Sequence, residues 1–275
     1  IVFFDDNNIC IDGPTDMAVI DDQPARFAAS GWQVQSVDGH DTAAIATAIE
    51  AAQADDRPSM IACKTVIGKG APNKEGTAST HGAPLGNEEI ALAREAMNWP
   101  HGPFEVPHDV LSAWRQAGAR GGEARATWSE RTAGVGDDFH RALAGELKDG
   151  WLDALNAHKA KCSEEKPKWA TRKASGEALA VLTEAIPEMI GGSADLTGSV
   201  NTKTPTTEPV TSSDFSGRYI HYGVREHAMG AVMNGIALHG GFIPYGGTFL
   251  VFADYMKGAM RLSALMEQRV VYVLT

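Results

Sequence analysis

Residues 5–13 (DDNNICIDG) place acid and amide side chains directly after a short apolar run at residues 1–4. An apolar run of this kind predicts a β-strand, here one that ends in oxygen-bearing side chains. Open α/β folds bind ligands outside the carboxyl ends of their parallel strands. Hard oxygen donors also suit Mg²⁺ or Ca²⁺ better than zinc. One interpretation is therefore a divalent metal with its phosphate, and the other is an ordinary turn, which Asp and Asn favour.

A second candidate is the stretch at residues 67–86, which contains five glycines and two prolines. The tripeptide Gly-Lys-Gly at 68–70 lacks the spacing of a nucleotide-binding P-loop, so that class of site is excluded. The backbone amides of such a loop, with nearby lysines and His81, could still hold a diphosphate. A solvated loop without a ligand is the alternative.

Three features of the second half could also carry chemistry. Glu226 follows the sequence YGVR at a predicted helix start, where a carboxylate either satisfies the helix dipole or serves a protonatable ring nitrogen. Phe249, Phe252 and Tyr255 recur every third position, as in a helix face that belongs to the core or to a cofactor pocket. Arg172 could bind a phosphate or remain solvated.

Two α/β patterns position these residues. In the first, apolar runs at 1–4, 33–37 and 60–66 alternate with helical stretches at 24–30 and 42–54, which predicts a parallel sheet. The polar, proline-containing run at 164–168 then marks a domain junction.

The second pattern begins after that junction. An apolar, turn-rich stretch lies at 189–196, and the remaining expected elements are helices at 175–184, 226–239 and 249–266 and strands at 219–222, 242–245 and 270–274. The chain starts within one strand and stops in or just after another, so we expect both domains to be incomplete.

Composition excludes several function classes. A formal net charge of −11 without a basic block argues against nucleic acid and anionic membranes as partners. Three cysteines, distant from one another, indicate neither a disulfide framework nor a zinc ribbon and favour the reducing cytoplasm. No apolar stretch approaches the roughly 18 residues of a membrane span.

Seven blocks, in this order, resemble the transketolase family of thiamine diphosphate enzymes. They are residues 5–13, 63–70, 81–86, 170–175, 191–197, 222–230 and 244–249. The resemblance covers nearly the whole chain and is weakest at about 101–167. It implies two thiamine diphosphate-binding-type domains with mostly parallel sheets and flanking helices, both incomplete. Their expected extents are 1–100 for the end of the diphosphate- and metal-binding domain, 101–168 for a helical tail and linker, and 169–275 for the start of the pyrimidine-binding domain.

The resemblance also implies roles for residues of the first domain. The side chain of Asn7 and the carbonyl of Ile9 would bind Mg²⁺, for which Ca²⁺ or Mn²⁺ can substitute. Ile11 and Ile67 would pack against the cofactor, thiamine diphosphate. His81 would contact the cofactor diphosphate and the ketose donor, as a catalytic residue.

In the second domain the implied roles concern the sugar and the pyrimidine ring. Arg172 and Ser199 would hold the sugar phosphate, and Asp195 would lie beside the thiamine at a subunit boundary. Glu226 would be catalytic, through a hydrogen bond to the pyrimidine ring nitrogen. The ring itself would be cradled by Phe249, Phe252 and Tyr255.

The implied activity is transfer of a two-carbon ketol unit from a ketose phosphate to an aldose phosphate, in the pentose phosphate pathway or the Calvin cycle. The active site would lie at the interface of a homodimer. The family's Gly-Asp-Gly stretch, whose Asp completes the metal shell, is absent, and so are upstream histidines of the donor channel and one expected after Thr275. We therefore expect the chain alone to be inactive. The alternatives are dihydroxyacetone synthase, the more distant deoxyxylulose phosphate synthase, and a non-catalytic binding module.

Overall fold

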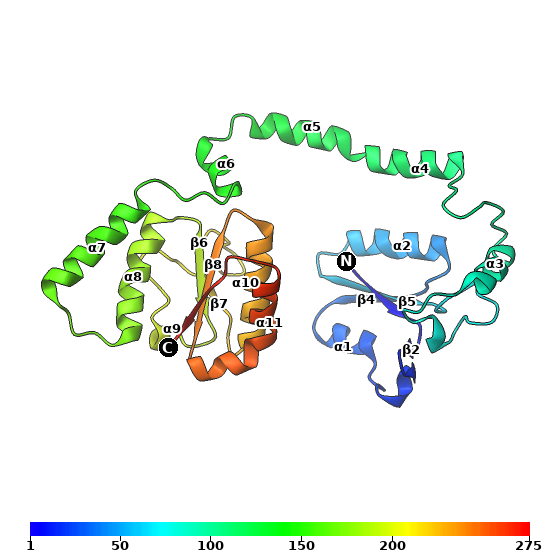
Figure 1. The fold of residues 1–275 in the computed structure, drawn as a ribbon, viewed down its shortest axis with the longest axis horizontal. Helices are drawn as coiled ribbons and strands as arrows, with labels where there is room; N and C mark the ends of the chain where they lie inside the picture. The colour runs from blue at the N-terminus through cyan, green and yellow to red at the C-terminus, as the bar shows by residue number, and fades with distance from the viewer. The chain divides into compact units, whose positions relative to one another are not determined.

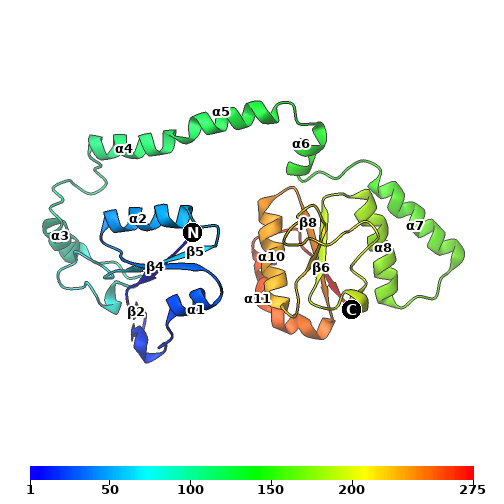
Figure 2. The same cartoon turned by 180° about the vertical axis from the view of Figure 1, so that it is seen from behind.

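The computed structural model describes residues 1–275, which form two compact units, Ile1–Ala119 and Arg120–Thr275 (Figures 1 and 2). Each unit is built around its own parallel sheet with helices beside it. The predicted α/β class is therefore confirmed. No helix of the chain is both long enough and apolar enough to cross a membrane.

In the first unit, β5 (Ser59–Lys64) lies between β1 (Val2–Asp6) and β4 (Gln33–Asp38), and all three strands are parallel. Every residue of β5 except the last is buried, as expected for a central strand. Figures 1 and 2 show α1 and α2 on opposite sides of this sheet. The other elements are α1 (Gln23–Ala29), α2 (Thr42–Gln53), the two-residue strands β2 (Ile9–Cys10) and β3 (Gly13–Pro14), the 3-10 turns η1 (Thr15–Met17) and η2 (Ala78–Thr80), α3 (Asn87–Ala96) and α4 (His108–Ala119).

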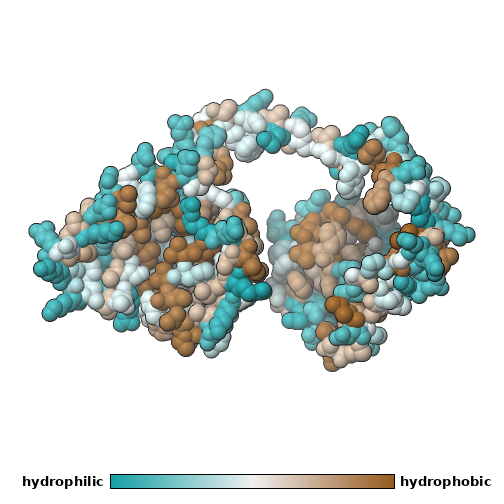
Figure 3. All heavy atoms as spheres, in the orientation of Figure 1, coloured by the Kyte–Doolittle hydropathy of each residue, from teal (hydrophilic) through white to brown (hydrophobic).

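The core of the first unit is small. Its buried cluster consists of Ala48 and Ala52 of α2 with Ile61 and Cys63 of β5. Near the N-terminus, Ile1, Val2 and Phe3 are exposed, and apolar surface is visible there in Figure 3. The sheet of the first unit therefore rests on a small buried cluster.

The second unit has a four-stranded parallel sheet in the order β7-β6-β8-β9. Figures 1 and 2 show α8 on one side of this sheet and α10 and α11 on the other. The strands are β6 (Met189–Ser193), β7 (Tyr219–His221), β8 (Ile243–Thr248) and β9 (Val271–Leu274). The helices are α5 (Gly121–Thr132), α6 (Asp137–Leu143), α7 (Trp151–Glu165), α8 (Thr171–Ala185), α9 (Thr197–Val200), α10 (Glu226–His239) and α11 (Ala253–Leu265), with the 3-10 turn η3 (Leu250–Phe252) before α11.

Two apolar clusters form the core of the second unit. One contains Leu179 of α8 with Met189, Tyr245 and Val273 of the sheet. The other joins the helices α10 and α11, and its buried members are Ala194, Tyr222, Met229, Met233 and Met256. The sheet of the second unit is therefore packed more extensively than that of the first.

Two glycines allow the strand β6 to lie between bulky neighbours. A Cβ atom at Gly191 would lie 2.0 Å from Cζ of Tyr245, and one at Gly192 would lie 2.3 Å from Cε2 of Tyr222. Neither distance is compatible with a side chain, so close packing of the tyrosine rings requires glycine here. The stretch predicted only as apolar and turn-rich is consequently the central strand β6.

Candidate functional site

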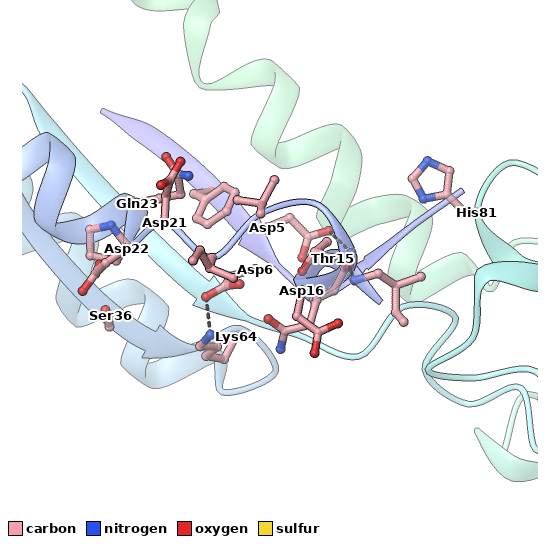
Figure 4. Close-up of a pocket in the computed structure, with 17 residues that line it drawn as sticks. Asp5, Asp6, Thr15, Asp16, Asp21, Asp22, Gln23, Ser36, Lys64 and His81 are labelled. Atoms are coloured by element: carbon pink, nitrogen blue, oxygen red, sulfur yellow. Dashed lines mark hydrogen bonds and ion pairs between the residues drawn. The ribbon is translucent and has the colours of Figure 1, made fainter. Parts of the chain in front are cut away.

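A cavity of about 770 Å³ opens at the carboxyl end of β1 in the first unit (Figure 4). Residues of β1, of the turn that follows it and of the start of α1 form most of its lining. Asn7, Ile9 and His81, three of the predicted site residues, all line it. Lys64 at the end of β5 also contributes, so the cavity lies at the strand ends where open α/β folds bind ligands.

Asn7 is held in a fixed orientation. Its Oδ1 accepts a hydrogen bond from the Ile9 amide at 2.9 Å, and its Nδ2 donates to Oδ2 of Asp5 at 3.3 Å. Asn8 takes a left-handed conformation with φ of 62°. This is the turn that the sequence predicted, and it leaves a second lone pair on Oδ1 for another partner. The turn and the metal-site interpretations are therefore compatible.

Carboxylates beside Asn7 are paired within the chain. The hydroxyl of Thr65 donates to Oδ1 of Asp5, and Lys64 forms an ion pair with Asp6 (Figure 4). No group of three or more His, Cys, Asp or Glu side chains is arranged to hold a metal ion. The available donors are hard oxygens, which fit Mg²⁺, but a complete shell needs further oxygens such as those of a phosphate.

The glycine-rich loop is closed by its own hydrogen bonds. The Gly76 amide donates to the Ile67 carbonyl at 2.8 Å, and the Val66 amide donates to Nε2 of His40 at 2.9 Å. Gly68 has φ of 64°, and a Cβ there would lie 2.8 Å from Cγ2 of Thr80, so only glycine is accommodated. His81 follows Thr80 directly, and close approach within the loop therefore helps to place it.

Two predicted cofactor contacts of the first unit lie outside the cavity lining. Ile11 is 73% exposed in the turn between β2 and β3. Ile67 is half-buried in the glycine-rich loop. The first unit by itself thus brings Asn7, Ile9 and His81 together but not these two side chains.

Glu226 is the first residue of α10, as predicted, and is only 8% exposed. Its carboxylate makes no hydrogen bond and no ion pair with any other residue of the chain. Its oxygens are not among the buried side-chain atoms that lack a partner, so the carboxylate reaches solvent from a residue that is otherwise buried at the amino end of the helix. The site therefore holds an acceptor that a hydrogen-bond donor on a ligand would satisfy.

The three aromatic residues form a row, although not on one helix. Ring centroids are 5.7 Å apart for Phe249 and Phe252 and 5.9 Å apart for Phe252 and Tyr255. Phe249 precedes the turn η3 and Phe252 ends it, so only Tyr255 lies on α11 and the prediction of a single helical face is wrong for the other two. Tyr255 is 67% exposed, so the core interpretation is wrong for it. The row is instead partly open, as a binding surface for a flat ring would be.

The predicted phosphate-binding residues lie on two helices. Arg172 is exposed in the first turn of α8, where it lines a cavity of about 420 Å³ with Leu274 and Thr275 at the end of β9. Ser199 is half-buried in α9 and does not line that cavity. Asp195, between β6 and α9, is exposed and left-handed, with φ of 60°.

Two residues that sequence reasoning missed also belong to this region. The hydroxyl of Thr248 is buried without a hydrogen-bond partner at the end of β8, directly before Phe249. His40 holds the glycine-rich loop through Val66. For Thr248 the available signal was its place at the end of a strand, whereas the partner of His40 lies 26 residues away and had no local signal.

Two protein-family models match the chain from end to end. The model described as "Transketolase, thiamine diphosphate binding domain" matches residues 1–167. The model described as "Transketolase, pyrimidine binding domain" matches residues 167–275.

Curated relatives agree with these matches. A transketolase of Cereibacter sphaeroides is 54% identical over 277 residues, and one of Sinorhizobium medicae is 52% identical over 281 residues. Both alignments include 100% of this chain but only 42% and 40% of the relatives. The chain thus spans about two fifths of their length.

Solved structures are similar as well. Transketolase from Leishmania mexicana superposes with a TM-score of 0.88 at 38% identity, covering 99% of this chain and 42% of that structure. A Pichia stipitis transketolase in complex with sedoheptulose 7-phosphate gives a TM-score of 0.86 at 38% identity, with the same coverage. The expected pair of thiamine diphosphate-binding-type folds is therefore confirmed.

Proposed function

The chain belongs to the transketolase family, and from that premise we propose that it is part of an enzyme that transfers a two-carbon ketol unit between sugar phosphates. The donor is a ketose phosphate and the acceptor an aldose phosphate. Thiamine diphosphate, once bound, supplies a nucleophilic carbon and the electron sink for breaking a carbon–carbon bond. The residues of the chain bind it, orient it and hold a proton at its ring.

The observation that carries this proposal is the carboxylate of Glu226, which belongs to a residue only 8% exposed and has no partner within the chain. We propose that Glu226 accepts a hydrogen bond at the pyrimidine ring and holds a proton there. Gly258 of α11 packs against the ring of His227, so the start of α10 lies beside the helix that carries Tyr255. The row of Phe249, Phe252 and Tyr255 would then cover the pyrimidine and exclude water, which strengthens a hydrogen bond to a carboxylate.

For the diphosphate end, we propose that Mg²⁺ is held by Oδ1 of Asn7 and the carbonyl of Ile9. The fixed amide of Asn7 supports this assignment, because it presents a hard oxygen at a strand end. His81 would contact the diphosphate and the ketose, while Ile11 and Ile67 would pack against the cofactor. Oxygens of the diphosphate would contribute to the rest of the metal shell.

For the sugar phosphate, we propose that Arg172 and Ser199 bind it and that Asp195 lies beside the thiamine. Arg172 offers a planar donor group suited to phosphate, and it is exposed and free of ion pairs. We also propose a cytoplasmic homodimer with its active sites between subunits. The groups that would meet the two ends of one cofactor lie on different compact units, which is the support for a shared site.

The test is the substitution Glu226→Gln in the full-length protein. We expect kcat for transfer from fructose 6-phosphate to ribose 5-phosphate to fall by about a hundredfold or more, the range for loss of a general acid–base group. Thiamine diphosphate with Mg²⁺ should still bind, as measured by calorimetric titration. Glu188→Gln is the matched control, because Glu188 pairs with Arg141 at the amino end of β6, whereas the predicted site lies at the carboxyl ends of the strands.

Undiminished transfer by the Glu226→Gln variant would contradict the role of Glu226. Failure of the unsubstituted protein to bind thiamine diphosphate would favour a non-catalytic module. Formaldehyde in place of ribose 5-phosphate as acceptor separates the proposed activity from that of dihydroxyacetone synthase. The 275-residue chain assayed alone should be inactive.

A further inference from the structure

Helix α9, which carries Ser199, is too short to hold its own position. It spans only Thr197–Val200, and Leu196 at its amino end provides no side-chain cap. Asn201, which ends it, is left-handed with φ of 53°. Because isolated turns of helix are not stable in water, the place of α9 depends on bonds to the rest of the unit.

A chain of four hydrogen-bonded hydroxyl groups supplies those bonds. Thr202 Oγ1 lies 2.9 Å from the Tyr219 hydroxyl, which donates to Thr197 Oγ1 at 3.0 Å. Thr197 Oγ1 lies 2.9 Å from Oγ of Ser193. Tyr219, Thr202 and Ser193 are all fully buried, so these bonds are shielded from water.

The direction of the two Tyr219 bonds follows from proton counting. A tyrosine hydroxyl has one proton, and that proton is directed to Thr197. Thr202 must therefore donate to Tyr219, whereas either Thr197 or Ser193 can donate in the bond between them. Tyr219 of β7 and Ser193 of β6 thus both tie Thr197 to the sheet, and Tyr219 also joins it to Thr202.

We propose that the Tyr219 hydroxyl is a positioning group for the sugar-phosphate site. It holds Thr197 and thereby sets the place of Ser199 and of Asp195 on the two sides of that residue. This inference rests on the proposed function, which assigns Ser199 to the substrate phosphate and Asp195 to the cofactor. Tyr219 itself is buried and touches neither ligand, so it acts only through α9.

Tyr245 provides a matched control within the same core. It is also fully buried, and its hydroxyl donates to the carbonyl of Thr202 at 2.9 Å. It lies on β8 and makes no hydrogen bond to α9. Tyr219→Phe and Tyr245→Phe therefore each remove one buried hydroxyl, but only the first removes an anchor of α9.

The experiment compares these two variants in the full-length enzyme. For Tyr219→Phe we expect KM for fructose 6-phosphate to rise about tenfold, since a misplaced donor loses most of a hydrogen bond to a charged group. We expect kcat to fall by less than KM rises, because Asp195 is the one residue assigned to the cofactor that adjoins α9. With erythrulose, a ketose without a phosphate, KM should change little. Tyr245→Phe should leave both KM values within about twofold.

A second measurement on the 275-residue chain tests the positioning directly. The amides of Ser199, Val200 and Asn201 donate to carbonyls of Leu196 and Thr197 and should be protected from hydrogen exchange. In Tyr219→Phe we expect these amides to exchange about tenfold faster, and in Tyr245→Phe we expect no change.

The outcomes are distinguishable. Equal kinetic effects of the two variants, or unchanged exchange in α9, would overturn the role of Tyr219. A protein that shows no ketol transfer before any substitution would overturn the proposed function instead, and the exchange experiment would still test whether Tyr219 anchors α9.

Discussion

The two units present their polar groups in opposite ways. In Ile1–Ala119 the groups beside the predicted metal site are already bonded to one another, as Asn7 is to Asp5 and Asp6 is to Lys64. In Arg120–Thr275 the carboxylate of Glu226, a residue only 8% exposed, has no partner within the chain. A ligand in the first unit has to exchange partners, whereas a ligand in the second supplies a missing one. The second unit is therefore the more selective of the two for a ligand group that can supply the missing hydrogen bond.

The hydrophobic cores of the two units also differ. The first unit rests on alanines, one isoleucine and one cysteine, while the second packs aromatic rings and methionines on its sheet. All five tyrosines of the chain lie in the second unit. A fixed, dry environment suits a group that must hold a proton in one place, and exposed turns suit a metal whose shell is completed by its ligand. The contrast between the units can be tested by changes of pH or of sequence that act on one unit alone.

Raising the pH to 11 should give the largest difference in stability between the two units. Burial, with a smaller effect of Tyr219, raises the pKa of Tyr222 to about 12, and burial raises the pKa of Tyr245 to about 12. Each contributes stability that is fully present below the unfolded pKa of about 10 and is lost as pH rises toward 12. At pH 11 we expect the second unit to lose roughly 2.5 kcal/mol of unfolding free energy.

Urea unfolding at pH 8 and pH 11 measures that loss. Trp151 reports on the second unit, where it packs against the core, and Trp32 reports on the first, with the other tryptophans replaced by Phe. The Tyr222→Phe, Tyr245→Phe double variant should show a much smaller change at the Trp151 probe. Equal losses at both probes would contradict the contrast between the units.

A smaller effect of opposite sign is expected from Glu226→Gln in the isolated chain. Replacing the unpaired charge of this largely buried residue with a neutral amide should raise the unfolding free energy of the second unit by about 1 kcal/mol at pH 7. Urea unfolding with the Trp151 probe measures it. Glu188→Gln should instead lower stability, because Glu188 is ion-paired with Arg141. Destabilisation by Glu226→Gln would mean that the carboxylate has a partner that supports the fold.

Sequence patterns predicted the framework of both units. Strand signals located β1, β4, β5 and β9, of which only β5 is buried along nearly its whole length. The helix at 226–239 has the predicted limits, with Glu226 as its first residue. The strand β6 was not recognised, because the glycines that admit Tyr245 and Tyr222 also remove the apolar pattern.

The site was predictable in part, and the remainder depends on distant contacts. The turn at Asn7 could be predicted because its hydrogen bonds are local, within two residues. The His40–Val66 and Tyr219–Thr197 hydrogen bonds join segments that are far apart in sequence. That Glu226 has no partner could likewise be seen only in the folded chain. Phe249 was assigned to a helix because spacing alone does not distinguish α11 from the turn η3 before it.

Lowering the pH should loosen the glycine-rich loop of the first unit. This is the smallest of the three expected effects. Glu89 of α3 accepts hydrogen bonds from the side chain of Asn73 at 3.0 Å and from its amide at 2.8 Å, and these lower the pKa of Glu89. A lowered pKa means that the anchor is fully present above the unfolded value of about 4.3 and is lost as pH falls through the native value. Loss of this anchor releases the glycine-rich loop at Asn73.

Hydrogen exchange at the Asn73 amide, corrected for the intrinsic effect of pH, measures that release. We expect protection to fall between pH 5 and pH 3, with no corresponding change at the Tyr219 amide of the second unit. In Glu89→Gln the protection should be weaker at pH 6 and independent of pH, because the amide does not titrate. Constant protection at Asn73 down to pH 3 in the unsubstituted chain would show that the loop is held without the carboxylate. The acid sensitivity of the first unit would then have to arise elsewhere than at the loop that carries Ile67 and His81.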